Sequence, residues 1–457
     1  MTTGGPDDRT TGRSPIWHPC TQMQDHVDFP PLHVVGATGC RLHLADGREV
    51  LDAISSWWCK SLGHGHPRLV AAAQAQAAAF EHVILANVVH DPALTLAKRL
   101  LALANAPLSA ARHYHHVFFA DNGSSGVEVA LKMAVHWQAQ AGDPRRTRLA
   151  CLAGGYHGET VGALAVGDLG LYAEPYRSLL FPCSRLDAVP WRDGPEDPAW
   201  LDAAAEWPVL ERQLAPLADT LAAIVYEPLL QGAGGMHPVS PDLLVRLRHW
   251  ADAHGVLLIA DEIASGMYRC GTFLAGHQAP GDGAADLVVL SKGLTGGWMP
   301  LATVLAPARI HDAFLAAWHE RKAFLHSNTY AGNPLACAVA NAALDTYAAE
   351  DIPARVATSG PWLRARLRDL AARQPCLRHV RGVGQVAAVD LTRPDGSPRD
   401  PLERGGWRVF QAAVARGALL RPLGDTLYLF PPLNASPAEL EAMLTILAQS
   451  VTDVTRL

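Results

Sequence analysis

Two short apolar runs, VLLIADEI (256–263) and DLVVLSKG (286–293), place the tightest constraint on how this chain folds. Their apolar residues are nearly continuous rather than alternating, which is typical of strands buried on both faces of a parallel sheet. Comparable runs, such as HHVFFAD (115–121) and LAAIVYEPL (221–229), alternate with helix-like segments throughout residues 63–335. This alternation predicts an α/β fold with a mostly parallel sheet sandwiched by helices.

The two ends of the chain differ from this central region. Residues 31–62 carry short alternating stretches with turns between them, which predict a small antiparallel sheet. Towards the other end, helix-like segments surround a few strand candidates, including GQVAAVDL (384–391) and TLYLF (426–430).

A chain of 457 residues is too long for one ordinary core, so we expect more than one domain. We assign residues 63–335 to a large domain. We interpret residues 1–62 and 336–457 as the two parts of one smaller α+β domain. The segment 183–215 is rich in Pro, Asp and Trp and predicts an exposed excursion.

Composition excludes several classes of function. The net charge is −6 and no long basic run occurs, so neither nucleic acid nor an anionic membrane is an expected partner. No apolar run approaches the ~20 residues of a membrane span, and the N-terminus lacks a secretion signal, so we expect a cytoplasmic protein. The 8 cysteines form no CxxC pair and the 21 histidines no HExxH pattern, so we expect no metal.

Lys292 follows the apolar residues of DLVVLSKG, and Asp261 follows those of VLLIADEI. They are 31 positions apart (292 − 261), close to the ~30 residues of one strand–crossover–strand unit. Ligands of open α/β sheets bind at the carboxyl ends of the strands. A lysine that forms a Schiff base and a carboxylate that keeps a pyridine nitrogen protonated suit pyridoxal phosphate. Taken singly, each residue has a commoner explanation: a lysine that reaches solvent and an aspartate that caps a turn.

Two further motifs suit the same ligand. In ADNGSSGVEVALK (120–132), Gly123 and Ser124 begin a predicted helix, whose N-terminus attracts a phosphate, although ordinary N-capping would also explain the serine. In GGYHGET (154–160), Tyr156 is placed to stack on one face of a planar ring. Ile263, two residues beyond Asp261 on the same side of an extended segment, is placed to cover the other face.

Together with HSNTYAGNPLAC (326–337), these motifs resemble the class III pyridoxal-phosphate-dependent aminotransferases of fold type I. The resemblance covers nearly the whole chain and implies a homodimer with shared active sites. IWHPCTQM (16–23), DAISSWW (52–58) and RPLGDTLYLFPPL (421–433) resemble the members of biotin biosynthesis. In that subgroup 8-amino-7-oxononanoate is aminated to 7,8-diaminononanoate, with S-adenosylmethionine as donor.

The resemblance also implies residue roles. Lys292 is the Schiff-base lysine and proton carrier, Asp261 pairs with the pyridine nitrogen, and Tyr156 stacks on the ring. Thr329 reaches the phosphate bound by the partner subunit, and Arg421 binds the carboxylate of the oxononanoate. The implied cofactor contacts are Gly123, Ser124, Tyr156, Glu227, Asp261, Ile263, Lys292, Asn328 and Thr329. The implied substrate contacts are Cys20, Trp57, Trp58, Tyr156, Lys292, Ser327 and Arg421.

Departures from the family pattern leave alternatives open. Cys20 stands where many members have tyrosine, and the Ser327-Asn328 pair also differs, so lysine remains an alternative donor to S-adenosylmethionine. A class III aminotransferase of ω-amino acids and pyruvate is a second alternative. An aminomutase or racemase on the same fold and a cofactor-binding regulator are less favoured, the last because no basic patch is present.

Overall fold

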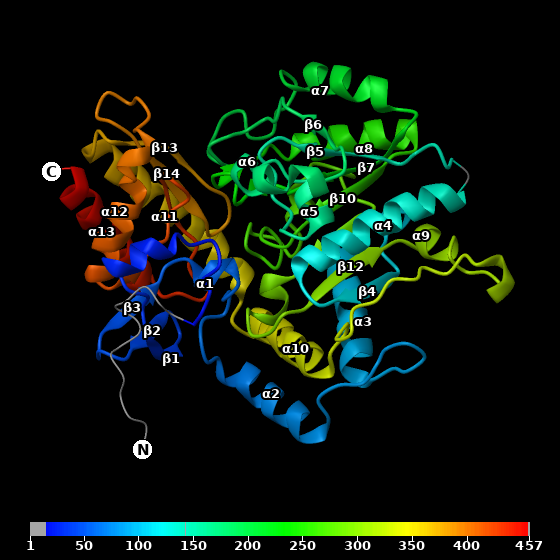
Figure 1. Cartoon of the computed structure of the whole chain (residues 1–457), viewed down its shortest axis with the longest axis horizontal. Coiled ribbons are helices and arrows are strands. Elements are labelled where there is room, and N and C mark those ends of the chain that lie inside the picture. The colour runs from blue at the N-terminus through cyan, green and yellow to red at the C-terminus, as the bar shows by residue number, and fades with distance from the viewer. Residues whose placement is uncertain (1–14, 142, 456–457) are drawn as a thin grey trace.

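The computed structural model describes residues 15–141 and 143–455. Its central feature is a seven-stranded sheet with the order β4-β12-β11-β10-β7-β5-β6 (Figure 1). Six of the seven strands run in one direction and only β12 runs in the opposite one, so the predicted mostly parallel sheet is confirmed. The strands are β4 (His116–Ala120), β5 (Arg148–Leu152), β6 (Ser184–Leu186), β7 (Leu221–Tyr226), β10 (Leu257–Asp261), β11 (Leu287–Leu290) and β12 (Ala302–Ala306).

Helices cover both faces of this sheet, which explains why its central strands are apolar throughout. In β10, Ile259 enters the core beneath α4 (Gly123–Ala141), whereas Leu258 and Ala260 enter a second core on the opposite face. That second core also receives side chains from α3 (Asp91–Asn105), α8 (Asp242–His254) and α10 (Pro334–Ala349). α2 (Pro67–Ala79) packs against α10.

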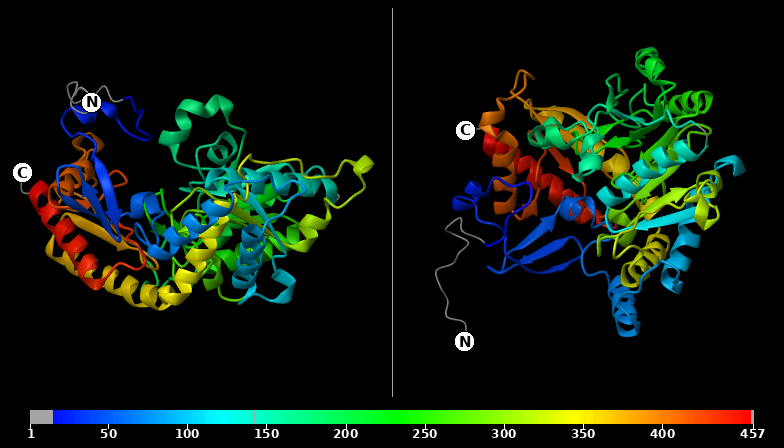
Figure 2. Two further views of the ribbon diagram at one scale, coloured as in Figure 1. Left: turned by 90° about the horizontal axis from the view of Figure 1, so that it is seen from below. Right: turned by 45° about the vertical axis from the view of Figure 1, so that its right-hand side comes forward.

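The ends of the chain meet in two smaller sheets. β1 (Val34–Thr38), β2 (Arg41–Leu44) and β3 (Glu49–Asp52) are antiparallel, and β15 (Ala418–Leu419) joins β3 in parallel. β13 (Leu377–Arg381), β14 (Ala387–Leu391) and β16 (Thr426–Leu429) form a second antiparallel sheet. Figures 1 and 2 show the N-terminal strands, in blue, beside the orange and red C-terminal helices α12 (Gly405–Ala415) and α13 (Pro437–Thr455).

A core of their own joins these terminal elements. It contains Leu51 of β3, Val389 of β14, Leu444 of α13 and Leu367 of the long helix α11 (Ile352–Arg373). The division of the chain at residues 62 and 335 stays a prediction.

The segment 183–215 departs from the expectation of an exposed excursion. It supplies the edge strand β6 and the helix α7 (Trp207–Leu214), and it buries Leu186, Trp200 and Leu210. Leu210 and Leu214 stand four residues apart on one face of α7, a helical spacing that the composition of the segment does not register.

Short elements complete the fold: α1 (Ser55–Trp58), α5 (Val161–Ala165), α6 (Gly170–Ala173), β8 (Leu230–Gln231), β9 (His237–Pro238) and α9 (Ala308–Asp312). Within the described residues, none of the helices combines the length and apolar character that a membrane span requires.

Candidate active site

A cavity of about 500 Å³ opens where the parallel strands of the large sheet reach their carboxyl ends. Asp261 closes β10, and Lys292 is the second residue after the neighbouring strand β11, at the start of the 3-10 helix η7 (Lys292–Thr295). Both side chains therefore line one cavity. The loops that follow β4, β5 and β7 supply further walls, which include Asn122, Gly123, Ser124, Tyr156, His157, Gly158, Glu159 and Glu227.

Lys292 lies against an aromatic wall. Its Nζ is 5.0 Å from the centroid of the Trp58 ring. Desolvation lowers the pKa of Lys292, although the negative charges of Asp261 and Glu227 act in the opposite direction. A lowered pKa increases the fraction of neutral amine, which is the nucleophilic form.

Asp261 is held in place through both carboxylate oxygens. Oδ1 accepts a hydrogen bond from the Ile263 backbone N–H at 3.0 Å, and Oδ2 lies 2.8 Å from Nδ1 of His157. Burial disfavours the charged imidazole, but the hydrogen bond and charge of Asp261 prevail and raise the pKa of His157. The pair therefore presents an oriented carboxylate at the floor of the cavity.

A second buried carboxylate, Glu227, positions the loop that carries Tyr156. Its two oxygens accept hydrogen bonds from the backbone N–H groups of Tyr156 and Gly232, each at 3.0 Å. Burial, reinforced by the charge of Asp261, raises the pKa of Glu227 to about 7. The Tyr156 hydroxyl donates to Glu159 Oε1 at 3.0 Å, and burial raises the pKa of Tyr156.

The first turn of α4 forms the end of the cavity that suits a phosphate. Asn122 caps the helix, because its Oδ1 accepts the Ser125 N–H at 3.0 Å. A Cβ on Gly123 would lie 2.9 Å from Ile263 Cδ1, so a larger residue here would have to displace the Ile263 side chain. Ser124 Oγ lies 2.8 Å from the Thr160 hydroxyl and accepts the Thr160 N–H. Unpaired N–H groups at a helix start attract anions.

This set of groups fits pyridoxal phosphate. An amine of lowered pKa faces an oriented carboxylate, and a helix N-terminus lies near Ile263, the residue predicted to cover one ring face. These are the groups that bind the aldehyde, the pyridine nitrogen and the phosphate of that cofactor.

At Trp57 and Trp58 the local backbone differs from the expected extended segment. Ser55–Trp58 form the short turn α1, with φ of 51, 45, 76 and 70° in order, so neighbouring side chains do not alternate across a strand. Trp58 is buried and lines the cavity, whereas Trp57 is 42% exposed and lies outside its lining.

Arg421 contacts both Trp57 and Cys20 beside the cavity. We call these three residues the rim, and none of them is part of the cavity lining. The Arg421 guanidinium carbon lies 4.8 Å from the centroid of the Trp57 ring, and its Nη2 donates to the Cys20 carbonyl at 2.7 Å. Cys20 Sγ is 3.8 Å from Glu159 Oε1. Cys20 and Arg421 also line a larger neighbouring groove of about 1270 Å³.

The structure does not bring Ser327, Asn328 or Thr329 into the cavity of their own chain. They lie between the 3-10 helix Trp318–Glu320 and α10, in a segment that reaches α4 through a 3.0 Å contact between His326 Nδ1 and Lys132 Nζ. Their predicted roles require a second chain and stay predictions.

Sequence reasoning missed two residues of this site. It assigned no role to His157 or Glu159, although both stand in the GGYHGET motif beside Tyr156, and that position was the available signal. Outside the cavity lining, it also missed the 2.9 Å contact between Asp52 and His64, which no local pattern reveals.

One group of possible metal ligands occurs among the described residues: His116, His311 and Asp312. The two imidazole rings are stacked, with centroids 3.6 Å apart and planes 11° apart. Nitrogen lone pairs lie in the ring planes, so parallel stacked rings do not direct them at one point.

Comparisons with known proteins agree on one family. The model of the family described as aminotransferase class-III matches residues 22–451. An adenosylmethionine-8-amino-7-oxononanoate aminotransferase of Synechococcus elongatus is 41% identical over 96% of this chain and 99% of that protein. A protein of the same name from Geobacter sulfurreducens is 36% identical over 98% of both chains. The solved amine transaminase of an uncultivated Pseudomonas species, in a PLP-bound form, has a TM-score of 0.88 and 34% identity over 96% of this chain and 99% of that one.

Proposed function

The chain belongs to the class-III aminotransferase family, with pyridoxal phosphate as its cofactor, and from this premise we propose that it aminates 8-amino-7-oxononanoate to 7,8-diaminononanoate in biotin biosynthesis. We propose S-adenosylmethionine as the donor. The family expected from the motifs is thereby confirmed. The names of the full-length relatives support the specific reaction, and the observation that carries it is Arg421 stacked on Trp57 at the rim.

Pyridoxal phosphate, when bound, stabilises negative charge on the carbon that gains or loses the amino group. In the proposed mechanism Lys292 holds the cofactor and then carries the proton at that carbon through its Nζ. Asp261 keeps the pyridine nitrogen protonated, and His157 keeps Asp261 oriented. Tyr156 covers the ring, in a position set by Glu227.

Arg421 and Trp57 explain how a long aliphatic keto acid is selected. A planar guanidinium binds a carboxylate with two parallel hydrogen bonds. The Trp57 ring beside it offers an apolar surface for the carbon chain, and Arg421 gives up its bond to the Cys20 carbonyl when the substrate carboxylate arrives.

The proposal includes a homodimer in which Thr329 contacts the phosphate bound by the partner subunit. Its support is that Ser327, Asn328 and Thr329 lie outside the cavity of their own chain, although they stand in a motif shared with the family. The cytoplasmic location expected from the sequence stays a prediction.

The decisive experiment incubates the purified protein and the ketone 8-amino-7-oxononanoate with S-adenosylmethionine, lysine or alanine, and measures diaminononanoate. We expect product with S-adenosylmethionine. Lys292→Ala should form none and should lose the yellow absorption band of the lysine-bound cofactor. Product with lysine alone would change the donor. Turnover of pyruvate but not of the ketone would favour the ω-amino acid class, and rearrangement of a single amino acid without donor would favour a mutase.

A further inference from the structure

The turn that carries Trp57 has an unusual backbone. Four consecutive residues that all bear side chains, Ser55–Trp58, have φ between 45 and 76°. This left-handed region is disfavoured for residues with a Cβ and is rarely occupied by several in a row. Such strain persists only where surrounding contacts enforce it, and it concentrates at functional sites.

Two sets of contacts enforce the turn. The Ser55 hydroxyl donates to the Phe430 carbonyl at 2.7 Å. Ser56 is held by Asp52, whose side chain is fully buried. Its Oδ1 accepts the Ser56 backbone N–H at 2.9 Å. Its Oδ2 accepts the Ser56 hydroxyl at 2.6 Å and lies 2.9 Å from His64 Nε2. Although burial opposes ionisation, these hydrogen bonds hold the pKa of Asp52 below its usual range. The carboxylate is therefore charged and fully engaged.

The two tryptophans of the turn are held in different ways. Trp58 has direct support, because its indole N–H donates to the Tyr428 hydroxyl at 3.0 Å and its ring lies beside Phe430. Trp57 is 42% exposed and rests on Arg421, a flexible side chain. The position of Trp57 is therefore set chiefly by the backbone that Asp52 holds.

His64 completes this support from the N-terminal side. Its backbone forms two hydrogen bonds with the backbone of Gly39, at 2.8 and 2.9 Å. These bonds fix the backbone from which the imidazole reaches Asp52. Without His64, Oδ2 of Asp52 would keep only the Ser56 hydroxyl, which is free to rotate.

We propose that His64 is a positioning residue of the substrate site: through Asp52 it holds the left-handed turn that keeps Trp57 against Arg421. The inference rests on the proposed function, because this pair is the proposed site for the carboxylate end of the ketone. Loss of His64 releases Trp57 and leaves Lys292 and Asp261 in place.

The chain offers a matched control two residues away. His66 has the same 11% side-chain exposure as His64 and also lies 2.8 Å from a carboxylate, but that carboxylate belongs to Glu350, at the end of α10. His64→Leu removes the support, and His64→Gln keeps a polar nitrogen near the position of Nε2. His66→Leu removes a similar contact, to a carboxylate that is 27% exposed and does not touch the turn.

The kinetic test compares KM for 8-amino-7-oxononanoate in these variants. His64→Leu should raise KM roughly tenfold, the scale of one lost hydrogen bond to a charged group, with the absorption band of the bound cofactor unchanged. His64→Gln should recover most of the loss. His66→Leu should lower the Tm by less than His64→Leu, because Glu350 is partly exposed, and should leave KM unchanged.

A double-mutant cycle separates positioning from general stability. If His64 acts through Trp57, His64→Leu adds nothing to KM in a Trp57→Ala background. Additive effects, or an equal rise of KM in His66→Leu, would overturn the proposal.

A crystal structure of His64→Leu gives a readout that does not depend on the substrate. We expect Ser56 and Trp57 to leave the left-handed region and Trp57 to move off Arg421, while Trp58 keeps its place. An unchanged turn would refute the role of His64, whereas failure of the wild-type protein to aminate the ketone would refute only the proposed function.

Discussion

Gly123 shows how a single residue shapes the cofactor site. The sequence motif predicts a phosphate-binding turn, and the structure adds the reason for glycine there, which is the close approach of Ile263 to α4. The residue is selected for space, since it does not need a positive φ.

Gly123→Ala should weaken binding of pyridoxal phosphate roughly tenfold, about 1.4 kcal/mol, because overpacking by one methyl group displaces Ile263 or the helix start. A titration of cofactor-free protein, followed by absorbance, measures the change. Ile263→Val removes the methyl group that the new Cβ would meet, so the double variant should regain affinity. Ser125→Ala, in the same turn, serves as the control, and an equal loss there would contradict the explanation.

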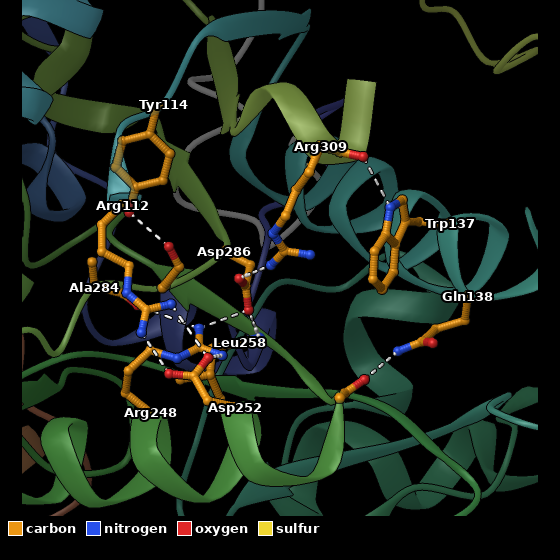
Figure 3. A network of polar contacts seen from close by, with 12 residues as sticks. Arg112, Tyr114, Trp137, Gln138, Arg248, Asp252, Leu258, Ala284, Asp286 and Arg309 are labelled. Carbon is orange, nitrogen blue, oxygen red and sulfur yellow. Dashed lines mark hydrogen bonds and ion pairs between the residues drawn. The ribbon is translucent and has the colours of Figure 1, made fainter. Parts of the chain in front are cut away.

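At the scale of elements, a buried ionic network fixes the strands that carry the catalytic pair. Asp286 directly precedes β11, at the opposite end from Lys292. Figure 3 shows its polar contacts. It accepts the Leu258 backbone N–H at 2.7 Å and binds Arg248 of α8 at 2.8 Å, and it also pairs with Arg309. The network ties β10, β11 and α8 together below the cavity.

Asp286→Asn should lower the free energy of unfolding by about 1.5–3 kcal/mol, because the buried Arg248 guanidinium loses its charged partner Asp286 and keeps only the pair with the more exposed Asp252. Denaturant-induced unfolding measures the loss. The control Arg145→Gln breaks a pair with Asp143 in which the arginine side chain is 74% exposed, and it should cost less than about 1 kcal/mol. Equal losses would show that the network contributes no more than a surface pair.

A second ion pair joins the segment 183–215 to α11. Glu196 receives hydrogen bonds from the buried Arg364 at 2.7 Å and from Arg368 at 2.9 Å. Partial burial opposes the effect, but the two arginines lower the pKa of Glu196 to about 2.

The lowered pKa of Glu196 predicts a dependence of stability on pH. In the unfolded chain a glutamate titrates near pH 4.3, so the ion pair contributes fully above that pH and its contribution disappears as pH falls towards 2. The difference in Tm between wild type and Glu196→Gln should therefore be largest above pH 5 and should shrink as the pH falls below 5. Glu174→Gln removes a carboxylate with a 65% exposed side chain and corrects for the change in net charge. A gap in Tm that is constant with pH would contradict the prediction.

At the scale of the whole molecule, the proposed dimer has a stoichiometric consequence. If Thr329 serves the partner's cavity, a hybrid of one Lys292→Ala subunit and one Thr329→Ala subunit contains one intact site and one doubly defective site. Random reassembly of equal amounts should restore about a quarter of the wild-type sites, measured as activity at limiting cofactor. If Thr329 served its own chain, no intact site would form and activity would stay at the level of the separate variants.

Much of the large sheet and its catalytic edge could be read from the sequence. Continuous apolar runs predict strands buried on both faces, and parallel strands bring their last residues to one edge, which is why Lys292 and Asp261 could be paired without coordinates. Both the burial rule and the edge rule apply within one strand–crossover–strand unit. In such a unit the short sequence separation of the two strands keeps their ends close together in the fold.

Only the tertiary structure could reveal that Arg421, Trp57 and Cys20 lie together beside the cavity. Arg421 and Cys20 are 401 positions apart, and Ser55 donates its hydroxyl hydrogen to a carbonyl 375 positions away, so no local pattern encodes either contact. The left-handed turn of Ser55–Trp58 contradicts local preference and exists because a buried carboxylate and a second sheet hold it. Burial in 183–215 was missed because its composition outweighed the helical spacing of Leu210 and Leu214. Periodicity in the sequence shows which face of a helix or strand is apolar. The site depends instead on hydrogen bonds between segments that are far apart in the sequence, and periodicity carries no information about them.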